Sequence, residues 1–291
     1  MTDSTKPNGQ LTIAVIGAGG KMGMRVSDNL QRSSHAVYYC ENSPTGQQRV
    51  RDAGRGVTDT PTAVGDAHVV ILAVPDVALD PVSAEVVPQL KPGTLLLTLD
   101  PAAAYANLLH QRSDVEYAVA HPCHPSVFLQ RKTEAELNDT FGGIAAAQDV
   151  VAALESGNKE KITIAEEVIR LMYAPVINVH WVTVKQLAYL EPTLVEVVAC
   201  MIGDLLNDAL RETVDTVGVP EAAARAMLFG HIQVALANGL RGDNPFSDAC
   251  LIAMDYGRSK IVKDDWKVIF QDDELDKNLQ AMLHLREPIS R

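Results

Sequence analysis

Apolar runs and amphipathic stretches alternate along the first 181 residues of the chain. A continuous apolar run is typical of a strand that is buried on both faces of a parallel sheet. Such runs occur at residues 11–16, 36–40, 66–74, 94–99 and 115–120, with further strand material at 144–147, 150–154 and 175–181. Stretches that favour helices lie between them, at 22–30, 47–53, 82–90, 102–111 and 160–172. The alternation predicts a doubly wound α/β domain with a mostly parallel sheet over residues 1–181, of which 1–10 are polar and expected to be disordered.

Strand signals largely disappear after residue 181. Helical patterns cover residues 183–217, 221–240, 247–256 and 264–285, and we expect Pro192 to interrupt the first of them. The sequence therefore predicts a C-terminal all-α domain over residues 182–291, which would bind substrate. Residues 183–217 are richer in Leu, Val, Ile and Ala than an exposed helix should be, so we expect this domain to form a homodimer.

A glycine-rich turn follows the first apolar run, and its spacing fits both G-x-G-x-x-x-G and G-x-x-G-x-x-G. Glycines let the backbone approach a pyrophosphate, and the N–H groups that begin the next helix attract its negative charge. Strand, glycines and helix in this order predict a Rossmann-type dinucleotide site. We expect cofactor contacts from the whole turn, which consists of Gly17, Ala18, Gly19, Gly20, Lys21, Met22 and Gly23.

An acidic residue stands at the end of the second apolar run. Glu41 lies 24 residues after Gly17, close to the usual place of the acid that binds the adenosine ribose. A carboxylate there favours NAD over NADP, because it would repel a 2′-phosphate. The third run ends in Val74, Pro75 and Asp76, which should also lie beside the cofactor, since strand ends of such a sheet face the ligand.

The bulk composition excludes several classes of protein. Twelve more acidic than basic residues give the 291-residue chain a net charge of −12, which argues against nucleic acid or an anionic membrane as a partner. No apolar run approaches the length of a membrane span. The four cysteines have no paired spacing, which indicates free thiols in a reducing compartment and hence a cytoplasmic protein.

Two histidines follow the fifth apolar run, in the sequence His121-Pro-Cys-His124-Pro. A histidine at a strand end beside a dinucleotide can take a proton from a substrate hydroxyl or bind a metal ion. We regard His121 as a functional residue on this ground. His124 is more simply interpreted as a surface or cap histidine.

The start of the helical domain carries further candidates. Lys185, Tyr189 and Glu196 are spaced by four and seven residues and would share one face of a continuous α-helix. Glu191 directly precedes Pro192, where helical geometry should be disturbed. A carboxylate at such a break can serve as a metal ligand, as an acid or base, or as a helix cap.

With these motifs in hand, the chain resembles the superfamily of 6-phosphogluconate, 3-hydroxyacid and prephenate dehydrogenases. More narrowly, His121-Pro-Cys-His-Pro-Ser126 and Tyr189-Leu-Glu-Pro-Thr-Leu-Val-Glu196 resemble motifs of the D-apionate oxidoisomerases. That resemblance implies an NAD-dependent enzyme that oxidises a branched sugar acid, D-apionate, and rearranges it to 3-oxoisoapionate.

The resemblance also implies a chemistry similar to that of ketol-acid reductoisomerases, which hold their substrate on divalent metal with two glutamates four residues apart. Glu191 and Glu196 are five apart, so we expect one metal ion, held by His121 and Glu191, of open identity among zinc, magnesium and manganese. The metal would polarise a carbonyl, and Lys185 or Glu196 would act as the base during the rearrangement.

Three other interpretations remain open. A simple 3-hydroxyacid or prephenate-type dehydrogenase would need no metal. A dihydrodipicolinate reductase fits one spacing of the glycines, but the expected segment rich in histidine and lysine is absent. A protein that binds NAD without catalysis would show no turnover of any sugar acid.

Overall fold

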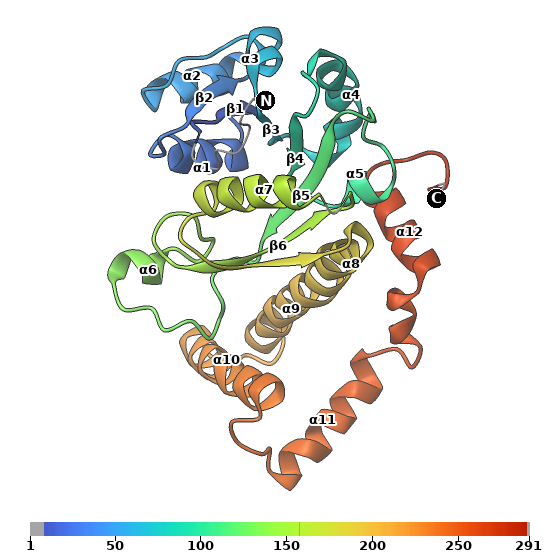
Figure 1. Ribbon diagram of the computed structural model, residues 1–291. Coiled ribbons are helices and arrows are strands. Elements are labelled where there is room, and N and C mark those ends of the chain that lie inside the picture. The colour runs from blue at the N-terminus through green and yellow to red at the C-terminus, as the bar shows by residue number, and fades with distance from the viewer. Residues whose placement is uncertain (1–8, 157, 290–291) are drawn as a thin grey trace. The chain divides into compact units, whose positions relative to one another are not determined.

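The computed structural model describes residues 9–156 and 158–289 (Figure 1), and within these ranges seven strands form one sheet. The expected disorder of residues 1–10 falls mostly on residues outside the described part. The sheet order is β2-β1-β3-β4-β5-β6-β7. Neighbouring strands run parallel except at the β5–β6 pair, which is antiparallel, so the predicted mostly parallel sheet is confirmed. The strands are Thr12–Ile16, Ala36–Cys40, Val69–Leu72, Leu95–Thr98, Glu116–Pro122, Gln148–Leu154 and Val176–Val182.

Helices cover both faces of this sheet, which makes the domain doubly wound. One core contains side chains of α1, α2 and α7 packed on β1, β3, β4 and β5, and Figure 1 shows α1 and α7 near each other. A second core lies on the opposite face, where α3 and α4 contribute Val64 and Leu79. The helices on the two faces are α1 (Lys21–Leu30), α2 (Pro44–Asp52), α7 (Lys159–Met172), α3 (Thr60–Asp66), α4 (Asp76–Val86), η1 (Val87–Gln89) and α5 (Ala102–Tyr105).

Two predicted elements differ from the structure. Residues 144–147 form no strand, because the backbone N–H groups of Ile144, Ala145 and Ala146 donate to the Asp139 carboxylate instead of to a neighbouring strand. The helix predicted for 102–111 ends at Tyr105, and the chain then turns through Asn107, whose φ of 56° is left-handed. Between β5 and β6 the chain forms only a short helix, α6 (Glu134–Asn138).

The helical path continues through Pro192, so the expected break is absent, but regular α-helical winding ends before it, at Ala188. α8 (Val184–Ala188) leads into the π-helix η2 (Tyr189–Cys200), which leads into α9 (Met201–Asp215). In an α-helix the proline ring would clash with the carbonyl of Ala188. The wider turn of a π-helix, with bonds from i to i+5, accommodates the ring and lets the helical path continue.

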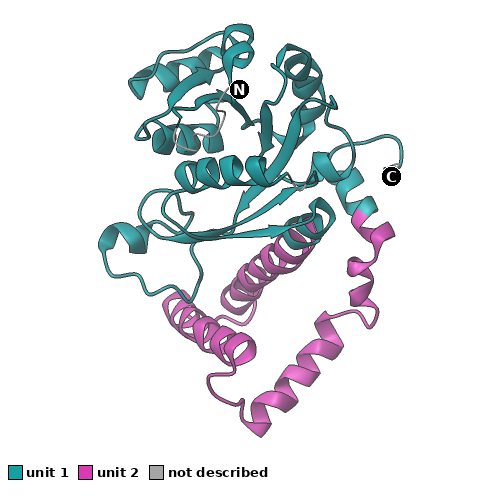
Figure 2. Ribbon diagram, in the orientation of Figure 1, with its two compact units in different colours: residues 1–191, 276–291 teal, residues 192–275 magenta. Residues whose placement is uncertain are grey.

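The chain divides into two compact units, which Figure 2 shows in separate colours. One consists of Met1–Glu191 together with Asp276–Arg291, and the other is Pro192–Leu275. Within the described residues the second unit contains helices and no strand, which confirms a helical C-terminal domain. None of the described helices is both long and apolar enough to span a membrane. The remaining helices are α10 (Glu221–Leu236), η3 (Ala237–Arg241), α11 (Asp248–Ile261), η4 (Trp266–Phe270) and α12 (Asp272–Met282), the last of which continues from the second unit into the first.

Candidate active site

The glycine turn between β1 and α1 packs backbone against backbone. The N–H groups of Gly17 and Ala18 both donate to the Cys40 carbonyl at the end of β2, at 2.9 and 3.0 Å. Gly17 has a left-handed φ of 81°, and a Cβ on Gly19 would lie 2.6 Å from the backbone of Gly46. No side chain caps the first turn of α1, so its N–H groups are available to a pyrophosphate.

Glu41 is bonded to this turn through its side chain. One carboxylate oxygen accepts from the Gly19 N–H at 3.0 Å, and the other accepts from the Ser43 N–H at 2.8 Å. Glu41 also lines a small cavity of about 100 Å³ together with Gly17, Asn42 and Thr60. The carboxylate therefore lies beside the glycine turn, and its contact with the ribose of a dinucleotide stays a prediction.

A larger cavity of about 380 Å³ joins the turn to the end of β5. It brings residues that were predicted to contact the cofactor together with His121, which was predicted as a catalytic residue or metal ligand. Its lining contains the turn residues Gly20, Lys21 and Met22, the strand-end residues Val74, Pro75 and Asp76, and Asp100, His121, His124 and Phe141. Six of the residues predicted to contact the cofactor therefore line one cavity together with His121, at the carboxyl edge of the parallel strands.

Three side chains at this site could hold a metal ion. Asp100 follows β4, His121 lies near the end of β5, and Glu191 belongs to η2. Each offers one ligand-type atom, and these atoms lie within 4.8 Å of one another. Glu191 is only 6% exposed, and a buried carboxylate beside an imidazole and a second carboxylate is an arrangement typical of a cation site. All three residues belong to the unit that contains the sheet.

His121 has the electronic state of a metal ligand or a base. Burial lowers the pKa of its imidazole, although the nearby Asp100 carboxylate and the bond to the Leu99 carbonyl act in the opposite direction. The ring is therefore neutral near pH 7. Its Nδ1 lies 3.1 Å from the Leu99 carbonyl oxygen and 3.8 Å from Oδ2 of Asp100. A proton on Nδ1 that bonds to Leu99 leaves the lone pair on Nε2.

Sequence reasoning missed Asp100. The residue stands in an Asp-Pro turn, and one of its oxygens accepts from the Ala102 N–H at 2.9 Å, as an ordinary turn aspartate does. The strand order was the signal that could have revealed it. β4 and β5 are parallel neighbours, so residues that follow their carboxyl ends come close together.

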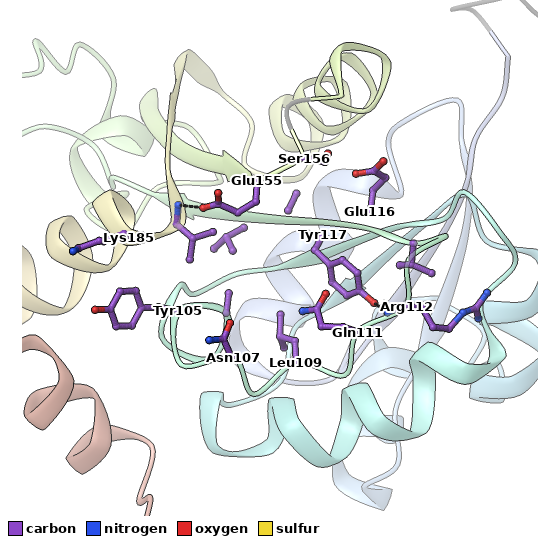
Figure 3. A pocket seen from close by; sticks show the side chains of 15 residues that line it. Tyr105, Asn107, Leu109, Gln111, Arg112, Glu116, Tyr117, Glu155, Ser156 and Lys185 are labelled. Atoms are coloured by element: carbon purple, nitrogen blue, oxygen red, sulfur yellow. Dashed lines mark hydrogen bonds between the residues drawn. The ribbon is translucent and has the colours of Figure 1, made fainter. Parts of the chain in front are cut away.

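The two residues predicted as bases, Lys185 and Glu196, are not among those that line this cavity. Lys185 lines another cavity, of about 450 Å³, together with Tyr105, Asn107 and Glu155 (Figure 3). There the Glu155 carboxylate accepts from the Val184 N–H at 2.8 Å. Glu196 belongs to the helical unit Pro192–Leu275. The spacing of four and seven residues that united Lys185, Tyr189 and Glu196 assumed α-helical winding, which the π-helix from Tyr189 onward does not have.

A doubly wound sheet, a glycine turn with an acid at the end of the next strand, and a cavity lined by ionisable groups are together typical of a dinucleotide-dependent oxidoreductase. Residues 12–108 match the NAD binding domain of 6-phosphogluconate dehydrogenase, and residues 129–283 match the C-terminal domain of decarboxylating phosphogluconate dehydrogenase. The chain is 60% identical to the D-apionate oxidoisomerase of Pectobacterium atrosepticum, over 94% of this chain and 96% of that protein. The chain belongs to the D-apionate oxidoisomerase family and is an NAD-binding oxidoreductase.

Two further relatives agree with this assignment. The D-apionate oxidoisomerase of Blautia hydrogenotrophica is 42% identical, with 96% of this chain and 99% of that protein covered. A crystal structure of a semialdehyde dehydrogenase NAD-binding protein from Cupriavidus necator, in complex with calcium and NAD, is 39% identical. It superposes with a TM-score of 0.90 over 94% of this chain and all of that one.

Proposed function

We propose that the chain oxidises D-apionate with NAD and rearranges the product to 3-oxoisoapionate, with a divalent metal ion held by Asp100, His121 and Glu191. One observation carries the metal part of the proposal. Asp100 and His121 line the cavity that the dinucleotide turn also lines, and a ligand-type atom of Glu191 lies within 4.8 Å of theirs. The relatives named as D-apionate oxidoisomerases support the substrate.

The donor set fits a metal ion. One imidazole nitrogen and two carboxylate oxygens suit zinc, manganese and magnesium, and carboxylates are also ligands of calcium. Calcium is the ion in the structure of the Cupriavidus necator relative. The identity of the ion therefore stays open in this proposal.

Each bound group would supply a chemistry that side chains lack. NAD accepts a hydride, and a divalent metal polarises the carbonyl that receives the migrating group. The chain's own contribution is to hold the substrate. Asp100 and Glu191 would bring negative charge to the ion, the neutral His121 would ligate it, and the uncapped N–H groups in the first turn of α1 would orient the dinucleotide.

The base for the rearrangement stays a prediction. During the rearrangement, one carbon loses the migrating group, and the hydroxyl on that carbon must lose its proton. The sequence suggested Lys185 or Glu196 as the acceptor of this proton. Lys185 lines a cavity whose other walls come from α5, β5, the connection between them, and Glu155 and Ser156, which follow β6. A variant, Lys185→Met or Glu196→Gln, that still forms NADH at the normal rate but no longer forms the rearranged product would identify the base.

A metal-free dehydrogenase is the second candidate, favoured by the position of His121 alone. A neutral histidine at the end of β5 could act as a general base for hydride transfer without any ion. The two proposals differ in their response to a chelator and in the products that they form.

The deciding experiment measures metal content, NADH formation and product structure with D-apionate, in wild type and in Asp100→Asn, His121→Ala and Glu191→Gln. We expect each variant to lose bound metal and rearranged product while NAD still binds. Asp114→Asn, which changes a surface carboxylate paired with Arg112, is the matched control and should keep both. Full activity of chelated wild type would overturn the metal site, and an unrearranged product would favour the simple dehydrogenase.

We also propose that the protein forms a homodimer through its helical unit. Helices α9, α10 and α11 expose large apolar side chains that the described part of the chain does not cover, among them Met201, Phe229 and Ile252, with 52%, 58% and 71% exposed. Large exposed apolar groups on three helices of one unit favour an interaction surface there. The four free cysteines fit a reducing compartment, so a cytoplasmic location is part of the same proposal.

A further inference from the structure

We propose that His124 is the base that accepts the proton of the substrate hydroxyl while hydride leaves the carbon that carries it. This assignment rests on the proposed function, because it names a proton acceptor for the oxidation step of that reaction. It concerns a residue that the sequence pattern left as a surface or cap histidine.

The oxidation needs an acceptor other than His121. An imidazole that ligates a metal has its lone pair engaged, so His121 cannot take a proton at the same time. Asp100 and Glu191 are engaged in the same way in the proposed site. His124 lines the same cavity as Asp100, His121 and the dinucleotide turn. Its ring centroid is 6.3 Å from that of His121, with the two rings nearly perpendicular.

The backbone of His124 holds an unusual conformation. Its φ is 59°, in the left-handed region that residues with a Cβ seldom adopt. Two prolines, Pro122 and Pro125, flank the turn and restrict its alternatives. A conformation of this kind has an energetic cost, and such residues gather at active sites where the surroundings hold them in place. In this conformation the His124 side chain lines the cavity, with its ring edge-on to that of His121.

The hydrogen bonding of His124 fixes which nitrogen is basic. Its Nδ1 lies 2.8 Å from the carbonyl oxygen of Phe141, which can only accept a hydrogen bond. The proton of the neutral ring therefore resides on Nδ1, and the lone pair on Nε2. A histidine that donates from Nδ1 to a fixed carbonyl is an oriented base, as the histidines of nucleophilic triads are.

Phe141 is itself held in position. Its ring packs against that of His124 with centroids 4.4 Å apart. The Lys21 ammonium lies 4.5 Å from the same ring centroid, and the Arg25 guanidinium lies 4.4 Å from it. Arg25 also donates to the carbonyl of Gly142, the next residue. The acceptor that orients His124 is thus tied to α1, the helix that begins at the dinucleotide turn.

The step balances without a further reactant. The substrate O–H bond breaks, and its proton forms an N–H bond at Nε2 of His124. The C–H bond of the same carbon breaks, and its electron pair moves with the hydrogen to the nicotinamide of NAD. The alcohol carbon is oxidised to a carbonyl, the cofactor is reduced, and the imidazolium releases its proton to water after the transfer.

His124→Asn is the variant that tests this assignment most sharply. Asparagine tolerates the left-handed backbone, and its amide can still donate to the Phe141 carbonyl, but it contains no base. We expect a fall in kcat for NADH formation of about 10²–10⁴-fold, the usual contribution of a positioned base. NAD affinity and metal stoichiometry, measured by titration calorimetry and metal analysis without substrate, should equal those of wild type.

His124→Gly adds a second measurement, the rescue of NADH formation by free imidazole, which we would not expect if His124 were only structural. It keeps the backbone conformation free of strain and opens a space for free imidazole, which should restore NADH formation at least about tenfold in that variant. His180→Asn is the matched control. His180, on β7, is a half-exposed histidine that pairs with Asp149 of β6, so imidazole should not change the rate at which this variant forms NADH.

The outcomes separate the two proposals. A wild type that does not turn over D-apionate overturns the proposed function and this assignment with it. An active wild type with an equally active His124→Asn overturns only the assignment to His124. Loss of NAD or metal binding in His124→Asn, or a His124→Gly variant that imidazole does not restore, also overturns it, since His124 would then be structural.

Discussion

Glu41 uses both carboxylate oxygens to hold the dinucleotide turn and the start of α2. A 2′-phosphate at this point would meet a negative charge that the protein holds in a fixed position. We therefore expect tighter binding of NAD than of NADP, and Glu41→Ala should narrow the difference by about tenfold, equivalent to ~1.4 kcal/mol. Titration of wild type and variant with each cofactor measures this. Tighter binding of NADP by wild type would contradict it.

Asp139 organises the segment between β5 and β6. Burial by itself raises the pKa of its carboxyl, but hydrogen bonds from Ala145, Ala146 and Ile144 outweigh this, and the pKa lies below its ordinary value. Because the folded pKa is depressed, the stabilisation is present above the unfolded pKa and is lost as pH falls through the folded one. Asp139→Asn should lower the free energy of unfolding at pH 7 by about 1–3 kcal/mol.

Denaturant titration at several pH values checks this prediction. The difference between wild type and Asp139→Asn should shrink in acid, where the wild-type carboxylate is protonated. Asp114→Asn serves as the control, because that carboxylate pairs with Arg112 at the surface, and its free energy of unfolding should change by less than about 1 kcal/mol. Equal effects of the two substitutions would show that the backbone hydrogen bonds contribute little.

At the scale of elements, the turn between β1 and α1 leaves no room for a side chain at Gly19. A Cβ there would meet the backbone of Gly46, which cannot move aside as a flexible side chain can. Gly19→Ala should therefore lower the free energy of unfolding by about 1–3 kcal/mol. It should also weaken NAD binding, because the turn must shift. Thermal unfolding and NAD titration measure the two effects.

Gly65→Ala provides the matched control for the same change. Gly65 lies inside α3, and nothing stands within 4 Å of the position that its Cβ would take. Alanine is the better helix former, so this variant should be as stable as wild type or more stable by up to about 1 kcal/mol. A Gly19→Ala variant that unfolds and binds NAD as Gly65→Ala does would contradict the close packing of the turn.

The elements that the sequence predicted well are those whose local pattern has one interpretation. The apolar runs at β1, β3 and β4 are continuous and fully buried, so they predicted both the strands and the parallel sheet. Residues 144–147 carry a similar pattern, but their hydrogen bonds go to Asp139, a contact that no periodicity reveals. The π-helix around Pro192 was equally hidden, because a proline in a helical pattern predicts a break and does not reveal a wider winding that accommodates it.

The candidate site was predictable in part for the same reason. His121 could be placed because it follows a strand that the pattern predicts, and Glu191 because a proline follows it. Asp100 required the knowledge that β4 and β5 are neighbours, which depends on the order of strands in the sheet. His124 required its backbone angle and the hydrogen bond to Phe141, both of which depend on how a long connection between strands folds.

At the scale of the whole molecule, the exposed apolar side chains of the helical unit lead to a prediction about assembly. Light scattering at micromolar concentration should give the mass of a dimer. Ile252→Glu places a charge on this surface and should raise the dissociation constant at least about tenfold. Leu137→Glu, at an exposed apolar position of α6 in the other unit, should leave it unchanged. A wild-type monomer would contradict the prediction.

The return of the C-terminal segment to the first unit has a consequence for chain cleavage. The polypeptide passes between the units twice, at Glu191–Pro192 and at Leu275–Asp276. After a protease cut in the exposed connection at residues 242–247, each fragment would keep a part anchored in the first unit. On the C-terminal fragment, Asp276 bonds to the Tyr105 hydroxyl at 3.1 Å and Leu279 is fully buried. In size-exclusion chromatography the nicked protein should therefore elute at the mass of the intact protein, and it should separate into two fragments only in denaturant. A helical unit that was attached by a single crossing would instead lose a fragment under native conditions.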